Sequence, residues 1–149
     1  MSKKNDIDLK IRGGPARIEG IEDYWGEIDL YKNSVHIGEA GFTMSSYQIY
    51  IDTITIDDAW QRLGYGKLIM DIFKGLARLL KKPINIYSLT DSYDFYIEMG
   101  FKSVNKIKKE GKKKIIVIYK TKDEPIIDDR QMLWLPESLR RKKELRIEL

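Results

Sequence analysis

The spacing of apolar residues along the chain changes once, close to residue 57. Before that point apolar and polar residues alternate with a period of two, which is typical of strands that bury one face. The alternation predicts strands over residues 7–11, 24–32, 35–44 and 48–56, with breaks at Gly13-Gly14-Pro15, Asn33-Ser34 and Ser45-Ser46. Strands that follow one another through short turns indicate an antiparallel meander.

After residue 57 the period becomes that of a helix. Residues 68–80 place apolar side chains on one stripe and charged side chains on the opposite face. Pro83 ends this helix, and residues 84–88 form a short apolar strand. A strand, a helix and a strand in this order imply a parallel crossover. A short helix that ends at Gly100 and a last hairpin over residues 101–120 complete the predicted elements.

Length and composition indicate one globular domain. The chain has 149 residues, of which 42% are hydrophobic and 34% are charged. We expect the domain to span residues 1–122. A C-terminal extension over residues 123–149 follows it, and we expect its Leu133-Trp134-Leu135 patch to pack on the core or on a second subunit of a homodimer.

Several classes of protein and site are disfavoured by what the sequence lacks. No apolar run approaches the roughly 18 residues of a membrane span, and residues 1–6 lead into no apolar signal region. The absence of cysteine excludes disulfides, thiolate metal sites and cysteine nucleophiles. His36 is the one histidine, and no His or Cys cluster surrounds it in sequence, so we expect no metal site. We therefore predict a cytoplasmic protein without a membrane partner.

The formal net charge of +4 is unevenly distributed. Residues 1–61 hold 6 Lys and Arg against 11 Asp and Glu, whereas residues 62–122 hold 15 against 5. The basic half favours an anionic cofactor and the acidic half a cationic acceptor, although solvated faces explain the same asymmetry equally well. Residues 102–122 contain 9 Lys and 1 Glu, but they lack the interleaved aromatic residues of a stacking platform, so a nucleic-acid partner is disfavoured.

The segment Gln61-Arg62-Leu63-Gly64-Tyr65-Gly66 stands between an apolar strand and the amphipathic helix. Its glycines let backbone approach a bound group, and the helix start supplies unpaired N–H groups and the positive end of a dipole. That combination favours a phosphate or pyrophosphate. The segment is not a Rossmann fingerprint, because Ile69 stands in place of the third glycine, and it lacks the spacing of a P-loop.

A second motif, Phe95-Tyr96-Ile97-Glu98-Met99-Gly100-Phe101, follows about thirty residues later. A Q/R-x-x-G-x-G segment followed at this distance by F-Y-x-x-x-G-F resembles the GNAT superfamily of acetyl-CoA-dependent N-acetyltransferases. The resemblance covers about residues 24–120, and the predicted order of elements is also similar. It implies an α/β fold with a mixed, mostly antiparallel sheet whose central strand pair splays apart, flanked by helices.

The resemblance also implies where acetyl-CoA would bind. The cofactor would lie in the V between residues 54–56 and 84–88, with its pantetheine arm against strand backbone and its pyrophosphate on the loop amides. A serine hydroxyl at the start of the short helix would add a contact, although Leu89 stands where the family usually has asparagine. The implied cofactor contacts are Ile54, Thr55, Ile56, Gln61, Arg62, Leu63, Gly64, Tyr65, Gly66, Lys67 and Ser92.

For catalysis, Tyr96 matches the family tyrosine near the thioester sulfur, the general acid to the leaving thiolate. The attacking amine must be neutral, so a base or a water chain removes its proton. Asp52 is the one carboxylate within residues 49–56 and is our candidate base; by alternation it would share a face with Tyr50 and Ile54. Glu27 and Asp29 on an earlier strand are rivals.

The acceptor side departs from the family pattern. Family members usually cover it with two helices, whereas residues 15–23 leave room for little more than one turn. An open side suits a peptide or protein amine, although a small-molecule amine stays open. Two other readings also stay open, a GNAT-fold module that binds CoA with weak or no catalysis, and a nucleic-acid binder that uses the Lys-rich hairpin.

Overall fold

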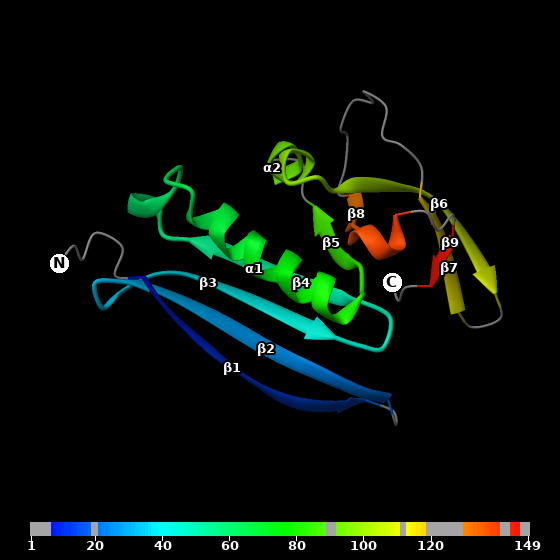
Figure 1. Cartoon of the computed structure of the whole chain (residues 1–149), viewed down its shortest axis with the longest axis horizontal. Coiled ribbons are helices and arrows are strands. Elements are labelled where there is room, and N and C mark those ends of the chain that lie inside the picture. Colours follow the sequence, from blue (N-terminus) through cyan, green and yellow to red (C-terminus); the bar gives the residue numbers. More distant parts are fainter. Residues whose placement is uncertain are drawn as a thin grey trace.

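The computed structural model describes residues 7–18, 21–88, 92–110, 113–118, 130–140 and 144–146. Its elements in chain order are β1 (Ile7–Ile18), β2 (Ile21–Lys32), β3 (Val35–Met44), β4 (Ile49–Ile56), η1 (Asp58–Trp60), α1 (Tyr65–Leu80), β5 (Ile84–Ser88), α2 (Tyr93–Glu98), β6 (Lys102–Glu110), β7 (Lys113–Ile118), β8 (Arg130–Trp134), η3 (Glu137–Leu139) and β9 (Glu144–Arg146). In the described residues the strands form one sheet in the order β1-β2-β3-β4-β5-β8-β6-β7-β9 (Figure 1). The first four strands are the predicted antiparallel meander.

The first strand is longer than predicted. Gly13-Gly14-Pro15 does not end β1, which stays paired with β2 as far as Ile18 and Ile21. Gly13 lies opposite Gly26, and a Cβ at Gly13 would stand 2.3 Å from the carbonyl oxygen of Trp25. The glycine therefore permits a close approach of two strands instead of breaking one, and Pro15 is tolerated because β1 is an edge strand.

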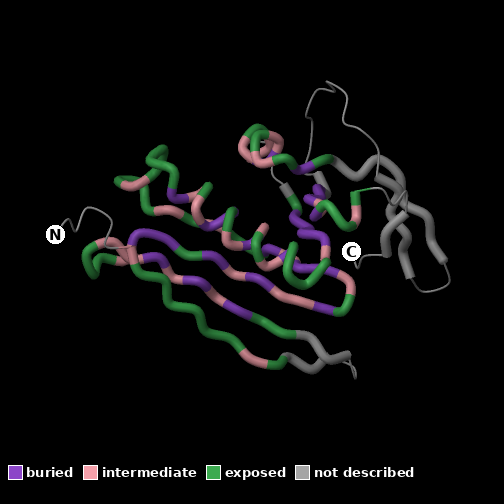
Figure 2. The backbone as a smooth tube through the Cα atoms, viewed as in Figure 1, coloured by how far each residue is buried: buried purple, intermediate pink, exposed green. Residues whose placement is uncertain are grey.

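The core lies between α1 and strands β2 to β5. Ile69, Met70, Phe73 and Ala77 of α1 are fully buried, and the Phe73 ring meets Phe42 of β3 edge to face at 5.3 Å. Figure 2 shows the buried positions along these strands and the inner side of the helix, whereas β1 is mostly exposed. The apolar stripe predicted for residues 68–80 thus packs on the sheet.

The central strands β4 and β5 are parallel, and they separate along their length. Their pairing runs only from Ile49 and Ile84 to Ile51 and Ile86, so the rest of β4 has no partner on that side among the described residues. The predicted parallel crossover through α1 and the predicted splayed strand pair are both confirmed. A V between two strands leaves backbone N–H and C=O groups of β4 available to another molecule.

Part of the expected C-terminal extension belongs to the sheet itself. Strand β8 lies between β5 and β6 and pairs antiparallel with β5 from Ile84–Trp134 to Ser88–Arg130. The apolar patch of this segment is largely buried, with Met132, Leu133 and Trp134 at most 4% exposed. Residues 123–129 lie outside the described part of the chain. The sequence pattern showed an apolar segment here, but not its position between two earlier strands.

No described helix is both long enough and apolar enough to cross a lipid bilayer.

The contact between Gly26 and Phe42 yields a test of the core. A Cβ at Gly26 would stand 2.3 Å from the Phe42 ring, which is itself held by Phe73. We expect Gly26→Ala to lower the free energy of unfolding by about 1–3 kcal/mol through overpacking. Gly75→Ala, at an open and exposed position of α1, is the matched control and should raise it by up to about 1 kcal/mol. Urea denaturation measures both, and equal stability of Gly26→Ala and the parent would contradict this packing.

Candidate active site at the splayed strands

The loop between η1 and α1 is shaped by two residues with positive φ. Arg62 has φ 64° and Gly64, the N-cap of α1, has φ 89°. The first helical hydrogen bond runs from the Leu68 N–H to the Gly64 carbonyl at 3.0 Å, so the preceding amides of the first turn have no partner within the helix. No acidic side chain stands in that turn. The loop therefore presents free donors and the positive end of the helix dipole to an anion.

Gln61 stabilises this loop through two hydrogen bonds of its side chain. Its side-chain amide donates to the Ile56 carbonyl at 2.9 Å and to the Asp58 carboxylate at 3.2 Å. These bonds tie the end of β4 to η1 and fix where the loop begins. They also occupy one acceptor of Ile56, a residue whose backbone the family resemblance offers to pantetheine. Arg62, Leu63 and Gly64 are exposed, and Leu63 is 63% exposed.

Lys32 is a residue of this region that the sequence did not indicate. It ends β2, and its ammonium donates to the hydroxyl of Tyr65 at 2.9 Å. Tyr65 is buried as the first residue of α1, and its ring meets Trp60 edge to face at 6.1 Å. The contact places a positive charge beside the helix start. No spacing rule connects residues 32 and 65, so only the folded chain shows the pair.

The two sequence motifs meet in space. A Cβ at Gly66 would stand 3.5 Å from the Phe95 ring, so α2 lies against the start of α1. Tyr96 is buried on α2. The centroid of its ring lies 5.3 Å from that of Phe95 and 5.5 Å from that of Phe101. Burial raises the pKa of the Tyr96 hydroxyl above its usual value. Its phenol therefore stays protonated at neutral pH, which a proton donor requires.

The candidate base lies at an irregular point of β4. Gly41 pairs with Thr53 and Phe42 with Ile51, so Asp52 is the extra residue of a bulge. Burial then switches from Ile49 and Ile51 to the later positions Ile54 and Ile56. The expectation that Asp52 shares a face with Tyr50 and Ile54 was wrong, because the bulge interrupts the alternation on which it depended.

Partial burial raises the pKa of the Asp52 carboxyl. Burial, the charge of Asp52 and the nearby Tyr87 raise the pKa of Tyr50. The charge of Asp52 therefore acts on Tyr50 of the same strand. Among the described contacts, none joins Asp52 directly to Tyr96.

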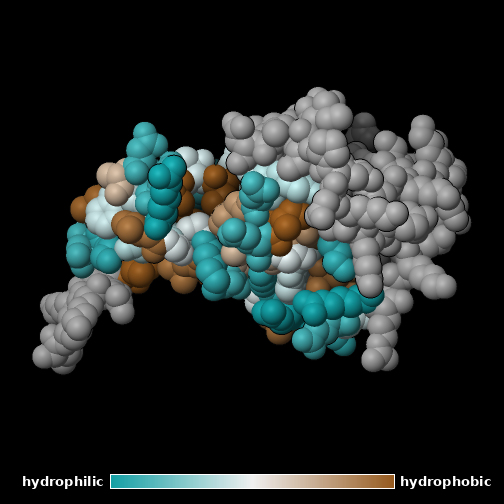
Figure 3. Space-filling model, turned by 90° about the horizontal axis from the view of Figure 1, so that it is seen from above, coloured by the Kyte–Doolittle hydropathy of each residue, from teal (hydrophilic) through white to brown (hydrophobic). Residues whose placement is uncertain are grey.

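The remaining candidates have different surroundings. Thr55 is exposed on β4, and Ser92 is the partly exposed N-cap of α2, whose side chain makes no capping bond. Glu27 is ion-paired with Arg12, and Asp29 is hydrogen-bonded to His36, so both rival bases already have partners. Figure 3 shows hydrophobic side chains scattered among hydrophilic ones on the upper face of the molecule.

The base of the V is held by buried polar contacts. Asn85 of β5 donates its side-chain amide to the side-chain oxygen of Gln48 at 3.0 Å, and both residues are buried. The Ile49 N–H donates to the Pro83 carbonyl at 2.9 Å. These bonds fix the closed end of the strand pair, and so determine where the open end begins.

Comparison with solved structures places this geometry in a known fold. Tetrahymena GCN5 matches with a TM-score of 0.56 at 16% identity, over 74% of this chain and 68% of that one. The PaiA N-acetyltransferase of Thermoplasma acidophilum, solved in complex with coenzyme A, matches with a TM-score of 0.55 at 12% identity, over 74% and 60%. At these identities the likeness shows the fold.

Sequence comparison supplies the family. An uncharacterized N-acetyltransferase of Staphylococcus epidermidis is 32% identical over 75 residues, which are 50% of this chain and 49% of that protein. The chain thus spans about half the length of the curated relatives it matches. The model of the acetyltransferase (GNAT) domain family matches residues 30–119, which include both motifs, the splayed strands and α1. The chain therefore belongs to the GNAT acetyltransferase family.

Proposed function

We propose that this protein transfers an acetyl group from acetyl-CoA to a primary amine. The observation that carries the proposal is the junction of β4, the loop and α1, where unpaired helix amides stand beside a strand that has left its neighbour. Pyrophosphate on the amides of residues 62–67 and pantetheine along residues 54–56 would use both features. Lys32 adds a positive charge beside the same helix start.

The chemistry follows from the two titratable groups of the site. The amine nitrogen attacks the thioester carbonyl, the C–N bond forms and the C–S bond breaks. The Tyr96 phenol donates its proton to the leaving thiolate, and Asp52, directly or through water, accepts the proton of the amine. A strand amide near Ile54 or Thr55 would stabilise the oxyanion. With no cysteine to carry an acetyl group, we expect direct attack in a ternary complex.

The acceptor class that suits this shape is a peptide or protein amine. Only two residues separate β1 from β2, so helices that would cover the acceptor side have no room between them. Tyr24 and Trp25 are 52% and 40% exposed on this hairpin. An uncovered side admits an extended chain more readily than it encloses a small metabolite.

The cofactor site is tested by reversing one charge. Lys67 stands in the first turn of α1 and pairs with Asp71 at 3.1 Å. Lys67→Glu adds a negative charge that favours the helix start but repels an anion, so we expect CoA to bind at least about tenfold more weakly. Calorimetric titration with CoA measures this, and thermal shifts with acetyl-CoA and with ATP test its specificity.

Lys81→Glu makes the same charge change at the far end of α1 and is the control. It should leave the dissociation constant of CoA unchanged. If both variants weaken CoA binding equally, or if neither variant weakens it, the pyrophosphate does not bind at this loop.

The acid role is tested by deleting one oxygen. We expect Tyr96→Phe to lower kcat roughly a hundredfold, because the thiolate would leave without a proton donor. CoA affinity and melting temperature should change little, since the ring still packs between Phe95 and Phe101. Tyr93→Phe removes the same atom from the same helix and is the control. Mass spectrometry of an acetylated peptide panel gives the rate. An unchanged kcat in Tyr96→Phe would exclude Tyr96 as the general acid.

If Asp52 is the base, its raised pKa sets how kcat/KM depends on pH. Its raised pKa means that it binds a proton at a pH where an ordinary aspartate is ionised, so as a base it loses activity as pH falls through that raised value. We expect Asp52→Asn to remove this limb of the kcat/KM profile. The same shift makes the ionised carboxylate unfavourable to the fold above its folded pKa, so the variant should be at least as stable at neutral pH. A profile that keeps its acidic limb in Asp52→Asn would exclude this residue as base.

A further inference from the structure

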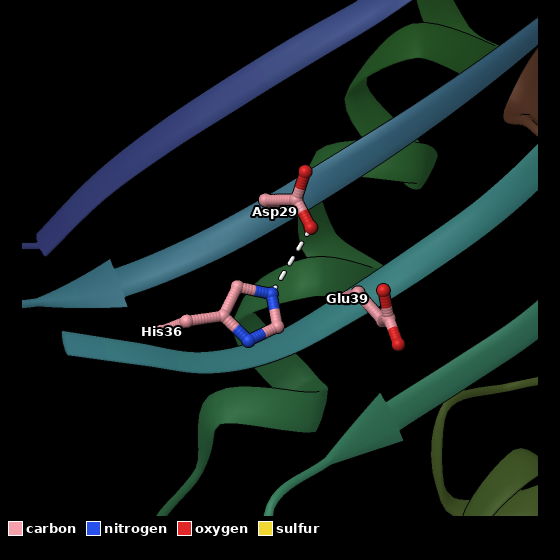
Figure 4. Close-up of side chains that lie close together, drawn as sticks. All are labelled: Asp29, His36 and Glu39. Atoms are coloured by element: carbon pink, nitrogen blue, oxygen red, sulfur yellow. Dashed lines mark hydrogen bonds and ion pairs between the residues drawn. The ribbon is translucent and has the colours of Figure 1, made fainter.

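Three potential metal ligands lie together on the face of β2 and β3 that is turned away from α1. Asp29 and Glu39 are direct cross-strand partners. The register then shifts, so that Leu30 pairs with Gly38 and Tyr31 with His36, and this bulge brings His36 to the same face. Figure 4 shows the imidazole directed toward the Asp29 carboxylate, with Glu39 next to them on β3.

Their ligand atoms are close enough to share one ion. His36 Nε2 is 3.0 Å from Asp29 Oδ1, and one ligand atom from each of the three residues lies within 4.8 Å of the others. Ligands of a tetrahedral zinc ion at 2.0–2.2 Å stand about 3.4 Å apart. Small rotations of these partly buried and exposed side chains on a fixed pair of strands would therefore reach this geometry, with water in the fourth position.

The charges around the cluster also favour a cation. Two carboxylates directly opposite one another on adjacent strands repel. Lys10 pairs in register with Asp29, yet its ammonium lies 4.8 Å over the Tyr31 ring. Arg12 lies near the cluster: its pKa is raised mainly by the bond to Glu27 and to a lesser extent by Asp29 and Glu39. Among the residues whose side chains the structure describes, Arg12 pairs with Glu27, and no lysine or arginine forms an ion pair with Asp29 or Glu39. Of these two carboxylates, the imidazole of His36 contacts that of Asp29 only, and among the described side chains Glu39 forms no ion pair.

We propose that Asp29, His36 and Glu39 form a site for a divalent transition-metal ion, with zinc as its best match. One imidazole nitrogen and two carboxylate oxygens are a donor set that zinc accepts, whereas magnesium and calcium prefer oxygen ligands alone. The ion takes the place of the proton between His36 and Asp29 and joins β2 to β3. This site does not depend on the proposed transferase activity, since it shares no residue with the loop or α2.

The composition of the chain makes the test direct. His36 is the one histidine and there is no cysteine, so the untagged protein has a single imidazole and no thiolate to compete for zinc. Long-range nitrogen–proton NMR spectra at fixed neutral pH should show the Nε2 resonance of His36 shift on addition of zinc and stay in place with magnesium. The melting temperature should rise with zinc. A resonance that stays in place at excess zinc would overturn the proposal.

Variants separate this site from adventitious binding. Glu39→Gln and Asp29→Asn should each weaken zinc binding, measured by calorimetry, at least tenfold, and His36→Gln should abolish it. Glu27→Gln is the control, because Glu27 lies on the same face of β2 but is paired with Arg12. Melting temperatures without zinc show that each variant is folded. Zinc binding that survives in Glu39→Gln and Asp29→Asn, or falls equally in Glu27→Gln, would disprove the three-residue site.

Discussion

The geometry of the candidate site follows from the separation of β4 from β5. The strands are held at one end by the Asn85–Gln48 bond and by the Ile49–Pro83 bond, and their ladder ends at Ile51 and Ile86. Beyond that point β4 must satisfy its backbone groups on one side without β5. The bulge at Asp52 coincides with this departure and changes which side chains of β4 face the core. Incomplete strand pairing thus leaves one edge of β4 unpaired among the described residues, and this edge is where we propose that pantetheine binds.

The end of β4 also fixes the position of helix α1. Gln61 bonds back to Ile56, so the loop starts where β4 ends, and α1 begins at its Gly64 N-cap with its free amides beside the open V. Phe95 of helix α2 packs beside Gly66 at the start of α1. Buried Tyr96, the next residue of α2, therefore lies close to the junction of β4 and α1. The positive end of α1 and the buried Tyr96 phenol, our proposed proton donor, are therefore neighbours, although their residues are far apart in sequence.

The face of the meander that is turned away from α1 is polar and charged. It carries the Arg12–Glu27 ion pair, the His36–Asp29 hydrogen bond and the carboxylate of Glu39, whereas the face toward α1 carries the core. Strand alternation separates the two faces, and the bulge near the end of β2 and the start of β3 brings His36 to the face of the two carboxylates. The sequence argument against a metal site considered only histidine and cysteine spacing, so it did not consider ligands that meet across strands.

The local elements could be predicted from the amino-acid pattern. This pattern predicted β3 over 35–44 and β5 over 84–88 with the observed bounds, together with α1, the turn at Asn33-Ser34 and the two motifs, because periodicity and turn chemistry act over a few residues. Which distant segments meet depends on the folded chain. The insertion of β8 between β5 and β6, the continuation of β1 past Gly13, the Lys32–Tyr65 bond and the Asp29–His36–Glu39 cluster all depend on strand register and packing. These are long-range contacts, and the alternation within one strand is compatible with many partners, so no local pattern specifies them.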